Sequence, residues 1–160
     1  MAPFFMDGIS SFEFEIIACS TYIVFMDSIF QKLSAVFNTA AFDGKRLWIV
    51  GGTVRDHLLG REPVDYDIAV EGNPADFAEA LARSYGGRPA AIGRGDLRIY
   101  RVATLGRLFD FGKIEDGGIE QDLRRRDFTI NAMAVSLKDG HIIDPLDGRR
   151  DLRRRRVRMV

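Results

Sequence analysis

The order of hydrophobic and polar residues becomes regular after residue 26 and predicts a helix followed by a strand. Apolar residues recur at helical spacing over Ile29–Phe37, with Asp27 or Ser28 placed to cap the start. Gly44 closes this unit. The short apolar run Leu47–Val50 then predicts a buried strand.

The next segment predicts a second helix, a second strand and a third helix. Gly51-Gly52 ends the first strand and opens a brief helix over Thr53–Leu59. Strict alternation over Val64–Val70 predicts a strand with one core face and one acidic face. Asn73-Pro74 predicts the next helix start, with Pro at the first helical position, and Gly86-Gly87 predicts its end.

The remaining sequence predicts three more strands, a polar helix and a hairpin. The strands cover Pro89–Ile92, Leu97–Val102 and Arg107–Phe111, the helix covers Ile119–Arg125, and the hairpin joins Ala132–Leu137 to His141–Asp144 around Asp139-Gly140. No internal repeat or low-complexity linker interrupts this order. We therefore expect an α+β fold, a mixed sheet with helices packed on it.

Composition supports one globular domain and limits which disulfides and metal sites the chain can form. The chain has 160 residues, 46% hydrophobic and 29% charged, which suits a protein with a buried core. The single Cys19 excludes an internal disulfide and favours a reducing, cytoplasmic compartment. One Cys and two His are too few for a tetrahedral zinc site, so a metal would be a hard ion held by carboxylates.

Residues 1–26 differ from the rest of the chain. The stretch Phe4–Met26 is rich in Phe and Ile, but three acidic residues interrupt it and the first basic residue is Lys32. We therefore expect neither a membrane span nor a signal peptide. The segment is predicted to be an N-terminal arm or edge strand, or to precede the true start at Met26.

Asp65 and Asp67 form the strongest local chemical feature. The period of two in a strand points both carboxylates to one face, roughly 7 Å apart. Two like charges this close are unfavourable unless a cation lies between them. Oxygen ligands suit Mg²⁺, which binds one or two carboxylates together with substrate phosphates. Ordinary surface strands also carry such pairs, so the spacing alone leaves both interpretations open.

Gly51-Gly52 and Arg55 indicate a phosphate site near this acidic pair. Glycine lets backbone N–H groups approach an anion closely, and a helix N-terminus adds a positive dipole. Arg55 stands one turn inside the predicted helix. A plain strand-to-helix turn would also use two glycines, but a phosphate cradle beside a divalent-metal pair points to nucleoside triphosphate chemistry.

Two further clusters leave alternatives open. Asp110 lies in an apolar strand, where an unpaired carboxylate is costly, so it either pairs with Arg98 or Arg101 or ligates the metals. Arg124–Arg126 either form a solvated helix end or hold a triphosphate, with Asn131 contacting a sugar hydroxyl or a base edge.

Together these segments resemble the head domain of the class II tRNA nucleotidyltransferase (CCA-adding enzyme) and bacterial poly(A) polymerase family. Leu47–Gly60 followed by Asp65-Tyr66-Asp67 resembles the first family motif, and Arg125–Ala132 resembles the second. Asp144–Leu152 is similar to the run that closes the head. The similarity covers about Leu33–Val160, and two long motifs in the right order make it specific.

The resemblance implies a DNA polymerase β-like nucleotidyltransferase fold and a set of residue roles. Asp65 and Asp67 match the magnesium-binding pair, and Asp110 lies where the third catalytic carboxylate is expected. The nucleotide-binding positions that match the family are Gly51, Gly52, Arg55, Arg126 and Asn131. Residues 27–160 would then form the head domain.

The implied activity is transfer of a nucleoside monophosphate from CTP or ATP to the 3′-hydroxyl of tRNA or another RNA. Bound Mg²⁺ ions would lower the pKa of that hydroxyl and stabilise the leaving pyrophosphate. Such a reaction depends on positioning and charge stabilisation rather than a side-chain nucleophile. Cys19 and His57 are therefore expected to be bystanders.

In the resembled family a neck, a body and a tail follow the head, and the chain ends where the neck should begin. This leaves a second expectation, a nucleotide- or RNA-binding module that is inactive until a separate neck and body segment joins it. Arg153–Arg156 would be the junction to the neck, or would bind RNA phosphates nonspecifically with salt-dependent affinity.

Overall fold

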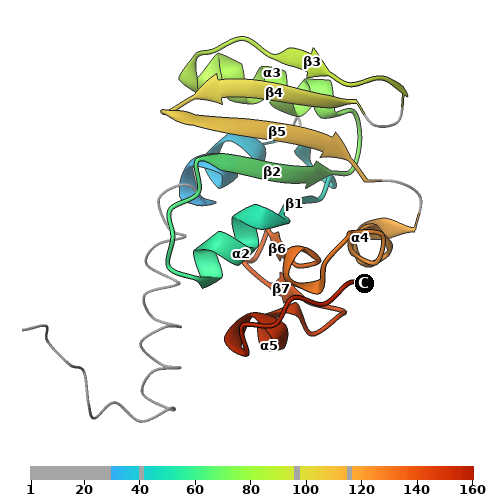
Figure 1. Cartoon of the computed structure of the whole chain (residues 1–160). Helices are drawn as coiled ribbons and strands as arrows, with labels where there is room; N and C mark the ends of the chain where they lie inside the picture. Colours follow the sequence, from blue (N-terminus) through green and yellow to red (C-terminus); the bar gives the residue numbers. More distant parts are fainter. Residues whose placement is uncertain (1–29, 40–41, 96–97, 115–116) are drawn as a thin grey trace, which may run out of the picture.

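The computed structural model describes residues 30–39, 42–95, 98–114 and 117–160. The expected N-terminal arm and the cap at Asp27 or Ser28 lie outside these residues. Within them, seven strands form one sheet in the order β3-β4-β5-β2-β1-β6-β7 (Figure 1). The strands are β1 (Leu47–Val50), β2 (Asp65–Val70), β3 (Ala90–Ile92), β4 (Ile99–Thr104), β5 (Arg107–Lys113), β6 (Ala134–Ser136) and β7 (Ile142–Ile143).

Helices follow the strands much as the periodicity predicts. Residues 30–37 are helical, and the remaining helices are α2 (Gly52–Leu58), α3 (Pro74–Tyr85), α4 (Gly118–Leu123), the 3₁₀ turn η3 (Thr129–Asn131) and α5 (Gly148–Arg153). The predicted α+β class is confirmed. No helix in the described ranges is long and apolar enough to cross a bilayer.

The sheet is mixed because one strand pair at its centre is parallel. β2 runs parallel to β5, while the other neighbouring pairs are antiparallel. The parallel register places Tyr66 beside Phe109 and Asp67 beside Asp110. Since side chains alternate along a strand, one face receives the aromatic residues and the other receives the acids.

The aromatic face carries the larger core. Helix 30–37 and α3 cover it, and Tyr66 stacks on Phe109 with ring centroids 5.2 Å apart. Phe77 of α3 and Phe111 of β5 are fully buried in the same cluster. Burial raises the pKa of Tyr66 to about 12, so its hydroxyl stays neutral at physiological pH. This packing fixes the position of β2 against β5.

The opposite face carries Asp65, Asp67 and Ala69, as the alternation predicts, but burial increases along it from Asp65 to Ala69. Ala69 is 6% exposed and packs with Trp48 of β1 and Leu123 of α4 in a second apolar cluster. Val64, expected in the core, is 61% exposed because the strand begins at residue 65. Asp65 and Asp67 therefore lie at the uncovered end of this face.

Candidate active site

The structure brings the three predicted carboxylates to one face of the sheet. Asp65 and Asp67 alternate with buried Tyr66 on β2, and Asp110 on β5 is the direct neighbour of Asp67. Burial raises the pKa of Asp67, and the charges of Asp110 and Asp65 raise it further, whereas Arg126 lowers it. The protein thus holds negative charge together at a point that favours a cation.

Asp110 pairs with Arg101 and not with Arg98, the other arginine that the sequence offered as a partner. Arg101 is its cross-strand neighbour on β4. The guanidinium donates two hydrogen bonds, Nε to Oδ1 at 2.7 Å and Nη2 to Oδ2 at 2.6 Å. Both carboxylate oxygens of Asp110 are therefore engaged, and its carboxylate raises the pKa of Arg101.

The donor set fits a divalent ion at Asp65 and Asp67. The part of the chain that the structure describes holds no ready group of three or more His, Cys, Asp or Glu arranged around a metal. Two carboxylates with open space for substrate phosphates are the arrangement that Mg²⁺ prefers. Asp110 accepts one hydrogen bond from Arg101 at each oxygen and keeps a lone pair on both, so it can add a third ligand from the neighbouring strand.

Thr53 positions the acidic pair, a role that the sequence pattern did not predict. Its hydroxyl donates to the carbonyl oxygen of Asp65 at 3.2 Å and accepts from the backbone N–H of Asp67 at 3.0 Å. The residue is 2% exposed in the first turn of α2. The available signal was a hydroxyl directly after Gly51-Gly52, but its partner lies on another element.

Gly51 lies at the point where the acidic pair meets the arginine motif. Its φ is +69°, a conformation that favours glycine. A Cβ there would lie 2.8 Å from Nη1 of Arg126 and 3.2 Å from Oδ2 of Asp67. The backbone bend at residues 51–52 therefore faces Asp67, as predicted, and it also faces Arg126.

A hollow of about 320 Å³ opens at this point. Its lining consists of Gly51, Gly52, Asp67, Arg125, Arg126, Asp127 and Asn131. Arg126 donates from Nη2 to Asp122 at 3.1 Å, while its buried Nε has no hydrogen-bond partner. Arg55 donates from Nη1 to Oδ1 of Asn131 at 2.7 Å, so α2 and η3 meet at the rim. This polar hollow, lined by two arginines and by Asp67 and Asp127, can receive a phosphate chain together with a cation.

Other features of the chain lie away from this site. His57 is 8% exposed, burial lowers its pKa, and its ring lies 5.9 Å from that of Tyr66. Cys19 lies outside the described residues. A larger hollow of about 580 Å³, between helix 30–37 and the turn leading into β1, contains none of the predicted site residues.

We expect the substitution Arg101→Gln to lower the melting temperature in metal-free buffer and millimolar Mg²⁺ to restore it. Without Arg101, the Asp110 carboxylate, which is 12% exposed and lies beside Asp67, loses both hydrogen bonds from the guanidinium. An uncompensated charge is costly, and a divalent ion can replace the lost guanidinium. Thermal unfolding with and without Mg²⁺ measures both effects.

Arg83→Gln serves as the matched control for Arg101→Gln. Arg83 pairs with Glu79 at 3.5 Å, but both side chains are more than half exposed. Surface pairs of this kind contribute about 0–1 kcal/mol. An Arg101→Gln protein with unchanged stability and no larger response to Mg²⁺ than wild type would contradict the prediction.

Comparison with known proteins identifies the family. A family model described as the poly(A) polymerase head domain matches residues 47–158. The chain belongs to this family. The matched range contains every predicted site residue, and the seven-stranded mixed sheet is that of a polymerase β-like nucleotidyltransferase. Nucleotidyltransferases of this type generally use divalent metals.

Relatives of this head domain are tRNA nucleotidyltransferases. The chain is 42% identical over 130 residues to the A-adding tRNA nucleotidyltransferase of Aquifex aeolicus, covering 72% of this chain and 16% of that protein. It is 40% identical over 127 residues to the CC-adding tRNA nucleotidyltransferase of Geobacter sulfurreducens, covering 78% and 29%. The chain thus spans less than a third of the length of these two relatives.

Solved structures show the same head domain. The CCA-adding enzyme of Thermotoga maritima complexed with tRNA matches with a TM-score of 0.74 and 34% identity, covering 88% of this chain and 35% of that one. A complex of a CCA-adding enzyme with CTP gives the same TM-score and identity and covers 88% and 36%. The family assignment therefore rests on sequence and on fold.

Proposed function

We propose that this chain is the catalytic head of an RNA 3′-end nucleotidyltransferase, using CTP or ATP and tRNA in the cytoplasm. One observation carries the proposal: Gly51, Asp67 and Arg126, from three separate segments, meet at one hollow. The tRNA-processing relatives and the CTP-bound structural neighbour support the substrate class. The single cysteine supports the compartment.

Asp65 and Asp67 would hold Mg²⁺ in this proposal. A bound ion would lower the pKa of the RNA 3′-hydroxyl and neutralise charge on the leaving pyrophosphate. Thr53 orients the pair by bonding the backbone of both residues. Arg101 offsets part of the carboxylate charge when the metal is absent, because it binds Asp110 on the neighbouring strand.

Arg126 and the Arg55–Asn131 pair would bind the nucleotide. The buried Nε of Arg126 lacks a partner, and a triphosphate oxygen in the hollow is a suitable acceptor. Asn131, already bonded to Arg55, has a free side-chain amide to donate to a ribose hydroxyl. Gly51 adds no side chain between Arg126 and Asp67, since a Cβ there would lie 2.8 Å from Nη1 of Arg126 and 3.2 Å from Oδ2 of Asp67.

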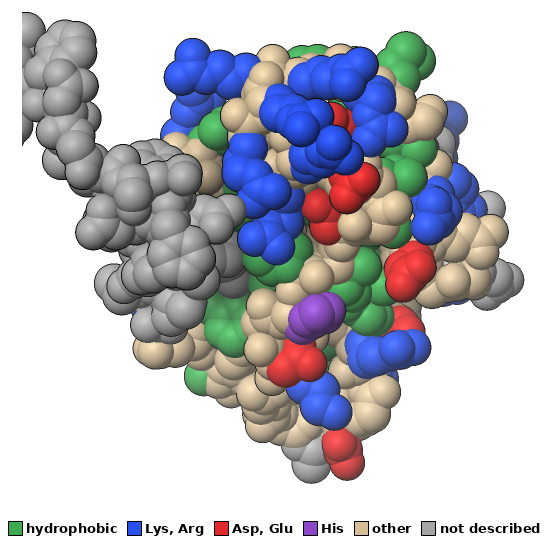
Figure 2. All heavy atoms as spheres, turned by 90° about the horizontal axis from the view of Figure 1, so that it is seen from below, with side chains coloured by type: hydrophobic (Ala, Val, Ile, Leu, Met, Phe, Trp, Pro, Cys, Tyr) green, Lys and Arg blue, Asp and Glu red, His purple; other side chains and the backbone are tan. Residues whose placement is uncertain are grey.

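A basic face next to α5 suits the RNA backbone. Figure 2 views the molecule from the side where α5 lies in Figure 1, and shows Lys and Arg side chains gathered with a few acids among them. Arg149 and Arg150 of α5 and residues 154–156, which follow this helix, are exposed. Contacts of this kind are salt-dependent and carry no sequence information.

Nucleotide titration tests the proposal. The wild-type chain is expected to bind Mg-CTP and Mg-ATP weakly, and Asp65→Ala/Asp67→Ala is expected to lose the Mg²⁺-dependent part of that binding. Isothermal titration with and without Mg²⁺ measures it. The control is Asp43→Ala/Glu79→Ala, which removes two exposed acids, one on the turn before β1 and one on α3, that do not line the hollow. Equal binding by the acidic-pair variant and the wild type would refute the metal assignment.

A second candidate is a nucleotide- or RNA-binding module without turnover of its own. The chain covers only 35% of the Thermotoga maritima enzyme chain that it matches. Pyrophosphate release with a tRNA that lacks its 3′ end separates the two candidates. Robust incorporation by this chain rejects the module, whereas binding without release supports it.

A further inference from the structure

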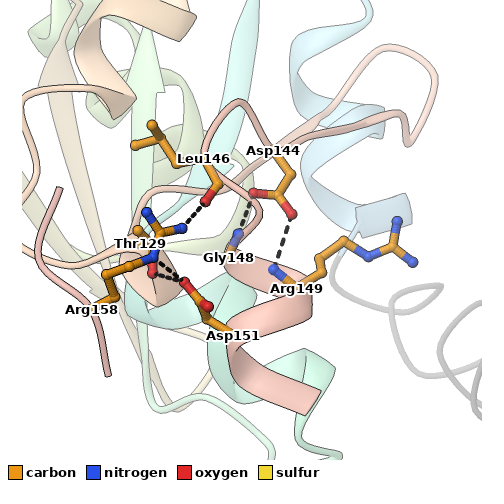
Figure 3. A network of polar contacts seen from close by, with 7 residues as sticks. All are labelled: Thr129, Asp144, Leu146, Gly148, Arg149, Asp151 and Arg158. Carbon is orange, nitrogen blue, oxygen red and sulfur yellow. Dashed lines mark hydrogen bonds and ion pairs between the residues drawn. The ribbon is translucent and has the colours of Figure 1, made fainter. Parts of the chain in front are cut away.

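A polar network with the buried side chains of Asp151 and Thr129 at its centre joins α5 to the segment that lines the hollow (Figure 3). Asp151 of α5 is 5% exposed, and its Oδ2 accepts from Oγ1 of Thr129 at 2.7 Å and from Nε of Arg158 at 3.0 Å. Arg158 also donates to the carbonyl oxygen of Leu146 at 2.7 Å. The Thr129 hydroxyl, the largest cause, and the Arg158 guanidinium hold the pKa of Asp151 below its usual range. The acid is therefore a charged anchor at neutral pH.

Backbone hydrogen bonds also join residues 127–129 to residues 158–160. The N–H of Thr129 donates to the carbonyl of Arg158 at 3.0 Å, and the N–H of Val160 donates to the carbonyl of Asp127 at 3.1 Å. Phe128 and Met159 form an antiparallel bridge between these bonds. Residues 127–129 are thus fixed from one side by residues 158–160.

The close approach of α5 to η3 adds a third constraint. The Cα of Gly148 lies so near η3 that a Cβ would fall 2.2 Å from the carbonyl oxygen of Thr129. Asp144 stabilises this start of α5, because its carboxylate accepts from the N–H groups of Gly148 and Arg149 at 2.7 and 3.0 Å. Thr129 is itself fully buried, so it has little freedom to move.

Thr129 stands between the two candidate nucleotide-binding residues of this segment. Arg126 precedes it and faces Gly51, and Asn131 closes the same 3₁₀ turn and accepts from Arg55. A shift of Thr129 therefore moves both groups relative to the hollow. In this fold the Asp151 carboxylate is the only charged group that contacts the Thr129 hydroxyl in the described part of the chain.

We propose that Asp151 is a positioning residue for nucleotide binding: it anchors Thr129 and Arg158 so that Arg126 and Asn131 keep their places around the hollow. The inference rests on the proposed function, because it gives Asp151 an effect on a nucleotide that it does not touch. Its effect on the position of residues 127–131 is independent of that function.

The test compares Asp151→Ala and Thr129→Val with Thr129→Ser in the full 160-residue chain. Valine has nearly the shape of threonine but removes the hydroxyl, whereas serine keeps it. Asp151→Ala and Thr129→Val are expected to raise the dissociation constant for Mg-CTP about tenfold, the weight of one hydrogen bond to a charged group. Thr129→Ser should bind like the wild type.

Asp139→Ala is the matched acid control, because Asp139 is exposed and accepts from His141 within the β6–β7 turn. Wild-type affinity in folded Thr129→Val would overturn the proposal. If Asp151→Ala does not fold, the comparison of valine with serine at residue 129 decides alone.

Amide hydrogen exchange of residues 127–131 separates this inference from the proposed function. If the wild type binds neither Mg-CTP nor Mg-ATP, the proposed function fails, and exchange alone then tests Asp151. Faster exchange in Thr129→Val than in Thr129→Ser supports the anchoring role, and equal rates overturn it.

Discussion

Asp67→Asn is expected to raise the melting temperature of the metal-free protein at neutral pH by about 2–4 °C, the shift that ~1 kcal/mol produces in a domain of this size. Asp67 lies beside Asp110 and near Asp65, and burial together with these charges raises its pKa. Asparagine keeps the shape and removes the charge that folding disfavours. Thermal unfolding in buffer with a chelator measures the difference.

The contribution of Asp67 to the stability of the wild type should decrease as the pH rises. Because the pKa of Asp67 is raised on folding, the native state binds more protons than the unfolded state between the ordinary and the raised value. Stability therefore falls as pH rises through that window and stays lower above it. Asp67→Asn should lack this pH dependence. Its melting temperature should therefore exceed that of the wild type above the raised pKa of Asp67, and the difference should disappear below the ordinary pKa.

Magnesium should raise the melting temperature of the wild type more than that of Asp67→Asn. A divalent ion at Asp65 and Asp67 binds the native state and stabilises it by mass action, whereas Asp67→Asn loses one of its two ligands. The wild type is therefore expected to gain melting temperature in millimolar Mg²⁺ and the variant to gain less. Asp43→Asn, on the exposed turn before β1, should behave as wild type. Equal responses of wild type and Asp67→Asn would contradict a metal site here.

The elements of this fold could be predicted because their signals are local. Asn73 caps α3 by accepting from the N–H of Ala75 at 3.2 Å, and the left-handed Gly86 ends it, as the sequence indicated. The alternation of β2 likewise gives its two faces from adjacent residues. Such signals need no knowledge of the rest of the chain.

The partners of the site residues could not be predicted in the same way. Arg98 and Arg101 both lie near Asp110 in sequence, and only the β4–β5 register, which pairs Arg101 with Asp110, decides between them. Thr53 likewise reaches a strand that begins twelve residues later. These contacts depend on how strands align, which the pattern of one strand does not contain.

Helix α5 lacks the apolar periodicity from which a helix can be predicted. Its six residues include three arginines, and within it only Gly148 and Asp151 are buried. What holds it in place is a close backbone approach and the contact between Asp151 and Thr129. The pattern of hydrophobic residues cannot predict a helix that is anchored by a glycine and an acid. The resemblance to the family nevertheless indicated that Asp144–Leu152 closes the head.

Gly148→Ala is expected to destabilise the protein by about 3 kcal/mol, the upper range for overpacking. The added Cβ would lie 2.2 Å from the carbonyl oxygen of Thr129 and 3.0 Å from Cγ of Met133. A backbone oxygen cannot rotate away as a side chain can, and this one also accepts from the N–H of Ala132. The helix must therefore move off η3, which also lengthens the Asp151–Thr129 bond.

Gly112→Ala is the matched control for Gly148→Ala. Gly112 also has an ordinary φ, and a Cβ there would make a normal contact of 3.7 Å with Ile99. Thermal unfolding should show a loss of ~10 °C for Gly148→Ala and little change for Gly112→Ala. Because the collision involves the segment that carries Arg126 and Asn131, Gly148→Ala should also weaken Mg-CTP binding at temperatures where it remains folded. Similar melting temperatures for the two variants would show that α5 can shift freely, and that the nucleotide segment is not held by it.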